Sequence, residues 1–154
     1  MTSELTSYVD IDATPERVWQ VLMDLPAYPE WNPFITSAEG EFVEGERVTV
    51  SVPPASAFIQ SRLRPTVVEV VPCRRLRLWS RIDRLGIPGL FDVEHTMTIT
   101  EQDDGARFWV QDRFGGLLAP VLIRSLNRHR LAAFNAVTAA LKNRVEGTQP
   151  RPED

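Results

Sequence analysis

The chain has 154 residues, and its 17 basic and 21 acidic side chains give a formal net charge of −4. Hydrophobic residues make up 43% and charged residues 25%, which favours one folded, water-soluble domain over a disordered or membrane-spanning chain. The acidic balance argues against nucleic acid as a partner, and no run of about 18 apolar residues is present that would insert into a membrane. Cys73 is the only cysteine and the N-terminus has no export-signal pattern, so we expect a cytoplasmic protein without an internal disulfide.

The first part of the chain predicts a strand followed by two short helices. Residues 8–11 favour a strand, and Thr14 then provides a helix cap, with Pro15 at the first helical position. An apolar face runs along this helix until Pro26 ends it. The stretch 28–33 is rich in proline and aromatic residues, which predicts a short second helix and a bend.

From Phe34 onward the apolar residues recur with a period of two, which predicts a succession of strands. Pro65 lies inside one of them and predicts a bulge or an edge position there. The apolar loop 85–89 has the composition of a flap over the mouth of a cavity. The expected strands cover residues 48–52, 59–71, 75–82, 91–100 and 107–114.

The C-terminal part predicts one long helix from about residue 118 to 144, with an apolar stripe that must be buried against the sheet. We therefore expect an α+β fold with a single domain over residues 1–146. In it, a curved antiparallel sheet of about seven strands wraps around the C-terminal helix, and two short helices follow the first strand. Residues 147–154 are expected to form a flexible polar tail.

Two polar residues occupy the apolar phase of the last two strands. His95 alternates in phase with Val93 and Met97, and Asp112 shares the phase of Val110. A tight turn centred on Asp103 and Asp104 would place His95 directly opposite Asp112 on the inward face. Such a pair could transfer a proton, or it could be a buried polar pair that satisfies itself and fixes the strand register.

His129 is expected to lie on the apolar stripe of the long helix and to face the same interior, as a further candidate for catalysis. Arg130, at the edge of that stripe, could contact a ligand carboxylate or ketone, although such an arginine more often reaches the surface. Two histidines and one acid could in principle hold a metal, but no i,i+4 ligand pair supports such a site, and we predict none. No phosphate-binding loop or dinucleotide fingerprint is present, so no cofactor is indicated.

A run of arginines covers positions 74, 75, 77, 81 and 84. It could form a phosphate- or RNA-binding stripe, but its alternation with apolar residues favours a solvated strand face. Trp31 could stack on a ligand, although a tryptophan between a helix and a strand is more often a packing anchor. Cys73 lies in a turn without a histidine nearby in sequence, so nucleophilic catalysis has little support.

Four segments carry a resemblance to a known family: residues 11–19, 28–33, 94–97 and 112–116. They are similar to the START/Bet v 1-like (SRPBCC) superfamily, in its polyketide cyclase/dehydrase-like branch, and the resemblance covers about residues 8–145. It implies a helix-grip fold with a deep hydrophobic cavity between the sheet and the C-terminal helix. Members of this superfamily include lipid and sterol carriers, ligand-sensing proteins and aromatase/cyclases.

We therefore expect the domain to bind a lipid, polyketide or aromatic compound in that cavity, as a carrier or sensor and as a monomer or homodimer. One alternative is a cofactor-independent cyclase/aromatase or dehydratase that uses His95 and Asp112 for proton transfer. A second alternative is a protein-interaction module. The expected ligand-binding residues are Trp31, Val48, Val50, Leu63, Leu78, Phe91, Met97, Phe108, Val110, Leu122, Leu126, Arg130 and Val137.

Overall fold

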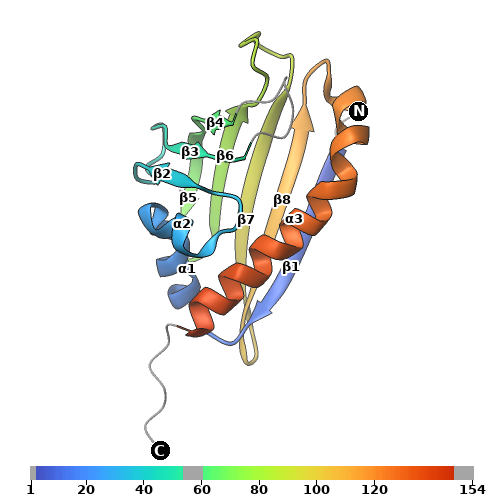
Figure 1. Ribbon diagram of the computed structural model, residues 1–154. Coiled ribbons are helices and arrows are strands. Elements are labelled where there is room, and N and C mark those ends of the chain that lie inside the picture. The colour runs from blue at the N-terminus through green and yellow to red at the C-terminus, as the bar shows by residue number, and fades with distance from the viewer. Residues whose placement is uncertain (1–2, 54–60, 148–154) are drawn as a thin grey trace, which may run out of the picture.

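The computed structural model describes residues 3–53 and 61–147, with the backbone alone described for residue 3 and residues 124–130. Three short helical segments follow the first strand, seven further strands come next, and a long helix ends the described part of the chain (Figure 1). In order, the elements are β1 (Ser3–Ile11), α1 (Pro15–Met23), η1 (Leu25–Ala27), α2 (Tyr28–Trp31), β2 (Ser37–Glu39), β3 (Thr49–Ser51), β4 (Arg62–Leu63), β5 (Thr66–Val71), β6 (Arg75–Arg81), β7 (Asp92–Gln102), β8 (Gly105–Gly115) and α3 (Ala119–Gly147).

The strands form a five-stranded sheet, ordered β1-β8-β7-β6-β5, and a three-stranded sheet, ordered β2-β3-β4. Every neighbouring pair is antiparallel, as an α+β fold with short hairpin connections requires. A single bridge between Arg47 and Thr66 links the two sheets. The long helix α3 lies across one face of the larger sheet, and the three N-terminal helical segments lie beside one end of it (Figure 1).

The expected single sheet of about seven strands is wrong in detail, because the predicted strand 59–71 is divided in two at Pro65. Proline has no N–H to donate to a neighbouring strand, so the ladder is interrupted there. Its carbonyl still accepts a hydrogen bond from the Val48 backbone N–H at 3.0 Å. The irregularity in strand pairing comes slightly later, between Val67 and Glu69. Residues 59 and 60 lie outside the described residues.

Helix α1 begins as its sequence predicts. The Thr14 hydroxyl accepts a hydrogen bond from the Arg17 backbone N–H at 3.2 Å, and Pro15 occupies the first turn. Its apolar face buries Val18 and Leu22 almost completely. The chain then tightens into η1 and α2, whose Tyr28 hydroxyl donates to the Leu22 carbonyl at 2.6 Å. Through Val18, Leu22 and Tyr28, the segments α1 and α2 therefore pack into the hydrophobic core.

The buried side chains form two separate hydrophobic clusters. The larger one joins α1 and parts of β5 to β8 to the C-terminal half of α3. It contains Leu78, Met97, Val110 and Phe134. The smaller one joins the ends of β6, β7 and β8 to the start of α3, and contains Phe91 and Phe114. These two phenylalanine rings stack with their centroids 5.9 Å apart.

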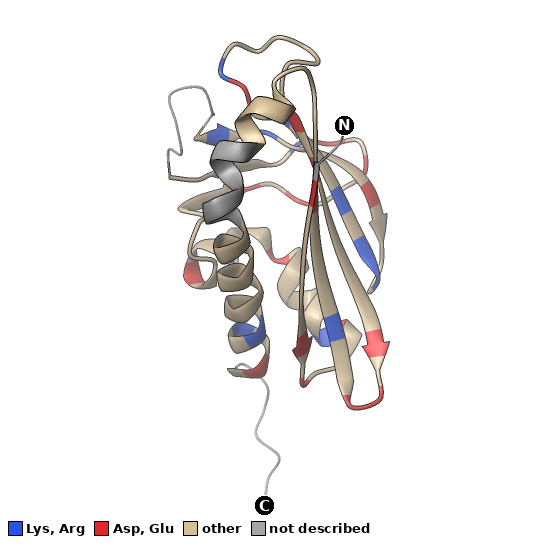
Figure 2. Cartoon of the chain, turned by 90° about the vertical axis from the view of Figure 1, so that its right-hand side faces the viewer, with Lys and Arg blue, Asp and Glu red and all other residues tan. Residues whose placement is uncertain are grey.

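Helix α3 is attached at both ends of its described length. Leu117 and Leu118 donate backbone hydrogen bonds to the loop before β7. Further along the helix, the Asn135 side-chain oxygen accepts a hydrogen bond from the Ser7 hydroxyl on β1 at 2.8 Å. Near the C-terminus, Glu146 accepts a hydrogen bond from the Asp12 backbone N–H at 2.9 Å. Viewed along the sheet edge, α3 covers the inner face as a separate layer (Figure 2). None of the described helices is both long and apolar enough to cross a membrane.

Candidate functional site

A transverse row of side chains crosses the inner face of the sheet, and the candidate site lies in the middle of it. Strand pairing places Leu5 opposite Asp112, Asp112 opposite His95, and His95 opposite Leu78. The predicted register of the last hairpin is therefore confirmed, because His95 and Asp112 are direct cross-strand partners. Alternation along β7 and β8 turns both side chains toward α3, in phase with the buried Met97 and Val110.

The two polar side chains contact each other: His95 Nδ1 is hydrogen-bonded to Asp112 Oδ1. Their exposures differ sharply, because the Asp112 side chain is 2% exposed and that of His95 is 31% exposed. A carboxylate removed from water to this degree needs a strong partner to offset the loss of its hydration. The imidazole provides that partner at one ring nitrogen, and the exposed remainder of the ring extends into accessible space.

The surroundings of the pair are apolar and belong to both clusters. The ring of Phe134, on α3, meets the His95 ring edge-on, with centroids 6.3 Å apart. Val93 and Phe114 lie two residues from His95 and Asp112 on the same strands, and they belong to the smaller cluster. Met97 lies two residues from His95 in the other direction and belongs to the larger cluster. The His95–Asp112 pair therefore lies at the boundary between the two clusters, where the sheet and α3 face each other.

This arrangement determines what the imidazole can do chemically. With Nδ1 engaged by the carboxylate, Nε2 is the ring nitrogen left to meet a third group. Nε2 accepts a hydrogen bond when the ring is neutral and donates one when the ring is protonated. An acid that orients a histidine in this way is also the arrangement used for general acid–base chemistry.

The predicted ligand-binding residues divide into two groups. Six are packed into the core: Val48 and Phe91 are 1% exposed, and the others are Leu78, Met97, Phe108 and Val110, at 2–9%. Five are half-buried, and apolar surface remains accessible there: Trp31, Val50, Leu63, Leu122 and Val137. The side chains of His129, Leu126 and Arg130 lie outside the described residues.

Trp31 packs against the larger cluster, as a packing anchor would. Its ring lies 4.8 Å from that of Tyr28, whose burial raises the pKa of its hydroxyl well above the ordinary value. Trp31 Nε1 is buried and has no hydrogen-bond partner in the described part of the chain. Its neighbour Asn32 accepts a hydrogen bond from the Phe34 backbone N–H at 2.9 Å and so stabilises the turn after α2.

Metal ligands are not gathered in the described residues, where no three His, Cys, Asp or Glu side chains are grouped as an ion would require. His95 and Asp112 provide two such groups and no described third one. The side chain of His129, the remaining candidate, is not among those described. Cys73 is half-buried in the turn between β5 and β6, with a φ of 61°, whereas His95 lies within β7.

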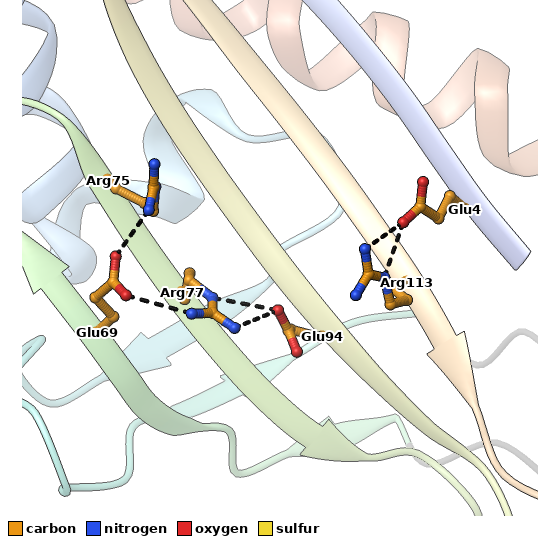
Figure 3. Close-up of polar contacts among 6 residues, drawn as sticks. All are labelled: Glu4, Glu69, Arg75, Arg77, Glu94 and Arg113. Carbon is orange, nitrogen blue, oxygen red and sulfur yellow. Dashed lines mark hydrogen bonds and ion pairs between the residues drawn. The ribbon is translucent and has the colours of Figure 1, made fainter. Parts of the chain in front are cut away.

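Most charged side chains on the outer face of the sheet are paired, as expected for a solvated strand surface. Arg75 and Arg77 both contact Glu69 at 3.3 Å, and Arg77 also contacts Glu94 at 2.7 Å (Figure 3). The Glu94 carboxylate raises the pKa of the Arg77 guanidinium. Two strands away, Arg113 makes a similar contact with Glu4 at 2.6 Å (Figure 3).

A basic pocket was not anticipated from the sequence. It has a volume of about 540 Å³ and opens where the two sheets meet, and its lining is Arg47, Thr49, Arg62, Arg64, Thr66, Trp79, Ser80 and Arg81. Its four arginines come from three separate stretches of chain, and only Arg81 belongs to the local run of arginines at positions 74–84. A second hollow, of about 310 Å³, lies on the outer face and is lined by Thr6, Thr96, Thr98, Trp109 and Gln111.

Comparison with known proteins agrees with this architecture. The protein MLL2253 from Mesorhizobium loti is 17% identical, with a TM-score of 0.75 over 96% of this chain and 100% of its own. Ara h 8.0201 is 14% identical, with a TM-score of 0.72 over 96% and 100%. Truncated norcoclaurine synthase from Thalictrum flavum is 12% identical, with a TM-score of 0.72 over 97% and 96%. At these identities the likeness concerns the fold alone.

No curated protein sequence matches the chain significantly. A family model does: the one described as "Polyketide cyclase / dehydrase and lipid transport" matches residues 2–147, almost the whole chain. The segments that resemble this branch lie on β1 and α1, on α2, and on the paired strands β7 and β8 that carry His95 and Asp112. The chain therefore belongs to the polyketide cyclase/dehydrase and lipid transport family, within the START/Bet v 1-like superfamily.

Proposed function

We propose that the protein binds a mainly apolar small molecule, such as a lipid, polyketide or aromatic compound, between its sheet and α3. In this role it acts as a carrier or sensor, and His95 Nε2 meets a polar group of the ligand. The observation that carries the proposal is the polar pair at the boundary of two apolar clusters, with a buried acid and a partly accessible imidazole. Ligand sites commonly combine an apolar wall with a few oriented polar groups.

The apolar part of the ligand would contact half-buried apolar side chains from two layers of the fold. Leu122 and Val137 come from α3, and Leu63 comes from the smaller sheet. Leu63 and Leu122 pack against the smaller hydrophobic cluster. The aromatic edge of Phe134 next to His95 supports an aromatic or polyene ligand, since rings pack favourably edge to face. Family membership supports the same class of ligand.

A proton-transfer enzyme is the second candidate, and the His95–Asp112 contact favours it specifically. Asp112 would orient the imidazole through Nδ1, and Nε2 would take a proton from, or give one to, a carbon or oxygen next to a ligand carbonyl. A reactive poly-ketone held in one conformation needs mainly orientation and one such proton transfer to cyclise. This function would be of the cyclase/aromatase or dehydratase type and would need no cofactor.

Binding is tested first by native mass spectrometry of protein purified from its own host, followed by identification of any released compound. A matched ligand pair, fluorenone and fluorene, then tests the role of His95, because the two differ in one carbonyl group. A protonated His95 ring donates from Nε2 to the fluorenone carbonyl oxygen, so in that state we expect the wild type to prefer fluorenone by roughly fivefold, as one hydrogen bond contributes about 1 kcal/mol. His95→Ala should remove this preference and keep the affinity for fluorene. A protein that binds neither compound, or a preference that survives in His95→Ala, contradicts the proposal.

The enzyme candidate is separated from the carrier by turnover. Incubation with a linear poly-ketone should give cyclised product with the wild type and none above background with His95→Gln, which retains a hydrogen-bond donor for Asp112. Binding of fluorene should be the same for both proteins, which shows that the variant is folded. If the wild type releases a bound compound unchanged and does not consume the poly-ketone, the carrier or sensor role stands and the enzyme role fails.

A further inference from the structure

The basic pocket, defined above by its eight lining residues, differs from the rest of the outer face in its charge. Four of the eight are arginines and none is acidic, in a chain whose net charge is −4. Arg47, Arg62 and Arg64 are exposed, whereas Arg81 is half-buried. Such a concentration of positive charge in an otherwise acidic protein creates a local field that attracts anions.

Strand geometry brings these residues together at the junction of the two sheets. Arg47 is bridged to Thr66, and Thr66 is paired with Trp79, so the three side chains form one row across neighbouring strands. Arg64 follows β4 directly, and Arg81 ends β6. Neighbouring strands lie about 4.8 Å apart, which is well within the reach of two arginine side chains toward a common ligand.

The pocket is an opening between strands. Pairing of β5 with β6 ends at Thr66 and Trp79, and β4 pairs with β3 alone. The end of β6 therefore separates from β4 beside Pro65, which cannot donate a hydrogen bond to close the gap. Ser80 lines the pocket although it belongs to the buried phase of β6 and is 6% exposed. Its presence in the wall shows that the pocket extends inward from the surface.

Among the residues that the structure describes, the arginines of the pocket have no carboxylate partners of the kind that Arg75 and Arg77 have. Within residues 3–53 and 61–147, no ion pair is formed by Arg47, Arg62 or Arg64. The segment 54–60 contains no Asp or Glu that could supply one.

Arg81 also lacks a carboxylate contact in the described part of the chain. It faces Asp92 across the β6–β7 ladder, but its Nη1 donates to the Gly86 carbonyl at 3.0 Å. Like charges gathered without a counter-charge repel one another, and a bound anion relieves that repulsion.

We propose that this pocket binds a phosphoryl group, free or as the phosphate ester of a small molecule. Guanidinium groups bind phosphate oxygens through paired hydrogen bonds, and several arginines match a dianionic phosphate better than a singly charged carboxylate. Thr49 and Thr66 add hydroxyl donors, and the partly exposed Trp79 provides a flat apolar surface for the organic part of an ester. This site is separate from the inner face and stands whether or not the proposed function does.

Isothermal titration calorimetry in low salt tests this proposal with three probes: inorganic phosphate, phenyl phosphate and benzoate. We expect saturable binding of both phosphates, and weaker binding of benzoate. Arg47→Gln combined with Arg64→Gln should weaken phosphate binding at least about tenfold, since charge-assisted hydrogen bonds are lost. The matched control is Arg75→Gln with Arg113→Gln, which removes the same amount of charge from paired positions on the outer face and should leave binding unchanged.

The outcomes separate cleanly. Tighter binding of phenyl phosphate identifies an ester as the ligand, and equal binding identifies free phosphate; both support the site. Absence of saturable phosphate binding, equal binding of benzoate, or an equal loss in the control variant overturns it. Thermal unfolding provides an independent readout that does not depend on a bound ligand. In phosphate-free buffer the pocket double variant should unfold at the wild-type temperature or above it, because repulsion is removed, and a lower temperature contradicts the charge argument.

Discussion

The inner and outer faces of the larger sheet each carry a cross-strand pair of an acidic and a basic side chain, in opposite environments. On the inner face, Asp112 is 2% exposed beside His95. On the outer face, Arg113 and Glu4 are 54% and 42% exposed. Water and salt screen the outer pair, so it contributes little to stability, whereas breaking the inner pair leaves a charge without hydration. The comparison indicates that one face of this sheet is built for solubility and the other for a specific polar contact within an apolar space.

The largest effect is expected from His95→Leu, which leaves the Asp112 carboxylate buried without its imidazole partner. We expect a loss of about 2–3 kcal/mol in the free energy of unfolding at neutral pH, less than the roughly 3–5 kcal/mol of a fully buried pair, because the partly exposed His95 position admits water. Asp112→Asn should cost less, since the remaining imidazole is partly exposed to water and no buried carboxylate is left without its partner. Urea denaturation measures both variants. Equal losses from the two variants would contradict this expectation. A loss from His95→Leu as small as that of a surface pair would show that burial of the inner pair adds nothing to its contribution to stability.

The next effect concerns the turn that sets which residues face inward. A Cβ at Gly105 would lie 2.3 Å from the Ile11 carbonyl oxygen, a contact that only a shift of the backbone can relieve. Gly105→Ala should therefore destabilise the protein by about 2 kcal/mol or more, measured by thermal unfolding. Gly45→Ala is the control, because its added Cβ meets nothing within 4 Å although its φ is also positive, at +85°. If Gly45→Ala lowers the unfolding temperature more than Gly105→Ala does, the close contact between position 105 and the Ile11 carbonyl is not what makes glycine necessary at the start of β8.

An intermediate case lies at the end of α3. Glu146 is contacted by Lys142 and by the Asp12 backbone N–H, and both interactions lower the pKa of its carboxyl. A lowered pKa in the folded state means that this stability is present above the unfolded value of 4.5 and is lost as pH falls through the folded value. Glu146→Gln should unfold at a lower temperature than the wild type at pH 7, and the difference should shrink below pH 4.5. A difference that stays constant over this range would show that the charge of Glu146 is not involved.

The smallest effect is expected from the outer pair itself. Arg113→Gln should lower the free energy of unfolding by less than about 1 kcal/mol, and the difference should vanish in molar salt. Urea denaturation at low and high salt checks this expectation. A loss from Arg113→Gln comparable to that from His95→Leu, or one that persists in high salt, would show that the pairs on the two faces contribute similarly to stability.

Local sequence patterns predicted much of the fold and the two residues at the centre of the site. Thr14 and Pro15 marked the start of α1, and the period of two on β7 and β8 placed His95 and Asp112 on one face. A tight turn then fixed their register, because hairpin pairing depends only on nearby residues. Each of these predictions used interactions that are close in sequence.

The predictions that failed, or were never made, depended on distant parts of the chain. Pro65 indicated an irregularity in the predicted strand 59–71, but the separation into two sheets and the basic pocket both depend on how β3, β4 and β6 meet, which no local pattern specifies. On α3, the apolar residues predicted a stripe through Val137 and Ala140, flanked by Phe134 and Leu141. The structure buries the two flanking residues together with Thr138 and leaves Val137 half-buried. The Thr138 hydroxyl donates a hydrogen bond to the Asn135 carbonyl at 3.1 Å, which allows this polar residue to be buried. A search for apolar residues alone does not predict its burial.

The proposed ligand contact at His95 is tested most directly by nitrogen-15 NMR of the histidine rings during titration with fluorenone. The chain has two histidines, so the His95→Gln spectrum assigns both signals. We predict that Nε2 of His95 shifts in a saturable way as fluorenone binds, and that fluorene, which lacks the carbonyl, leaves it nearly in place. A saturated complex in which the His95 ring does not respond, while the perturbed backbone amides lie on the outer face of the sheet, would contradict binding between the sheet and α3.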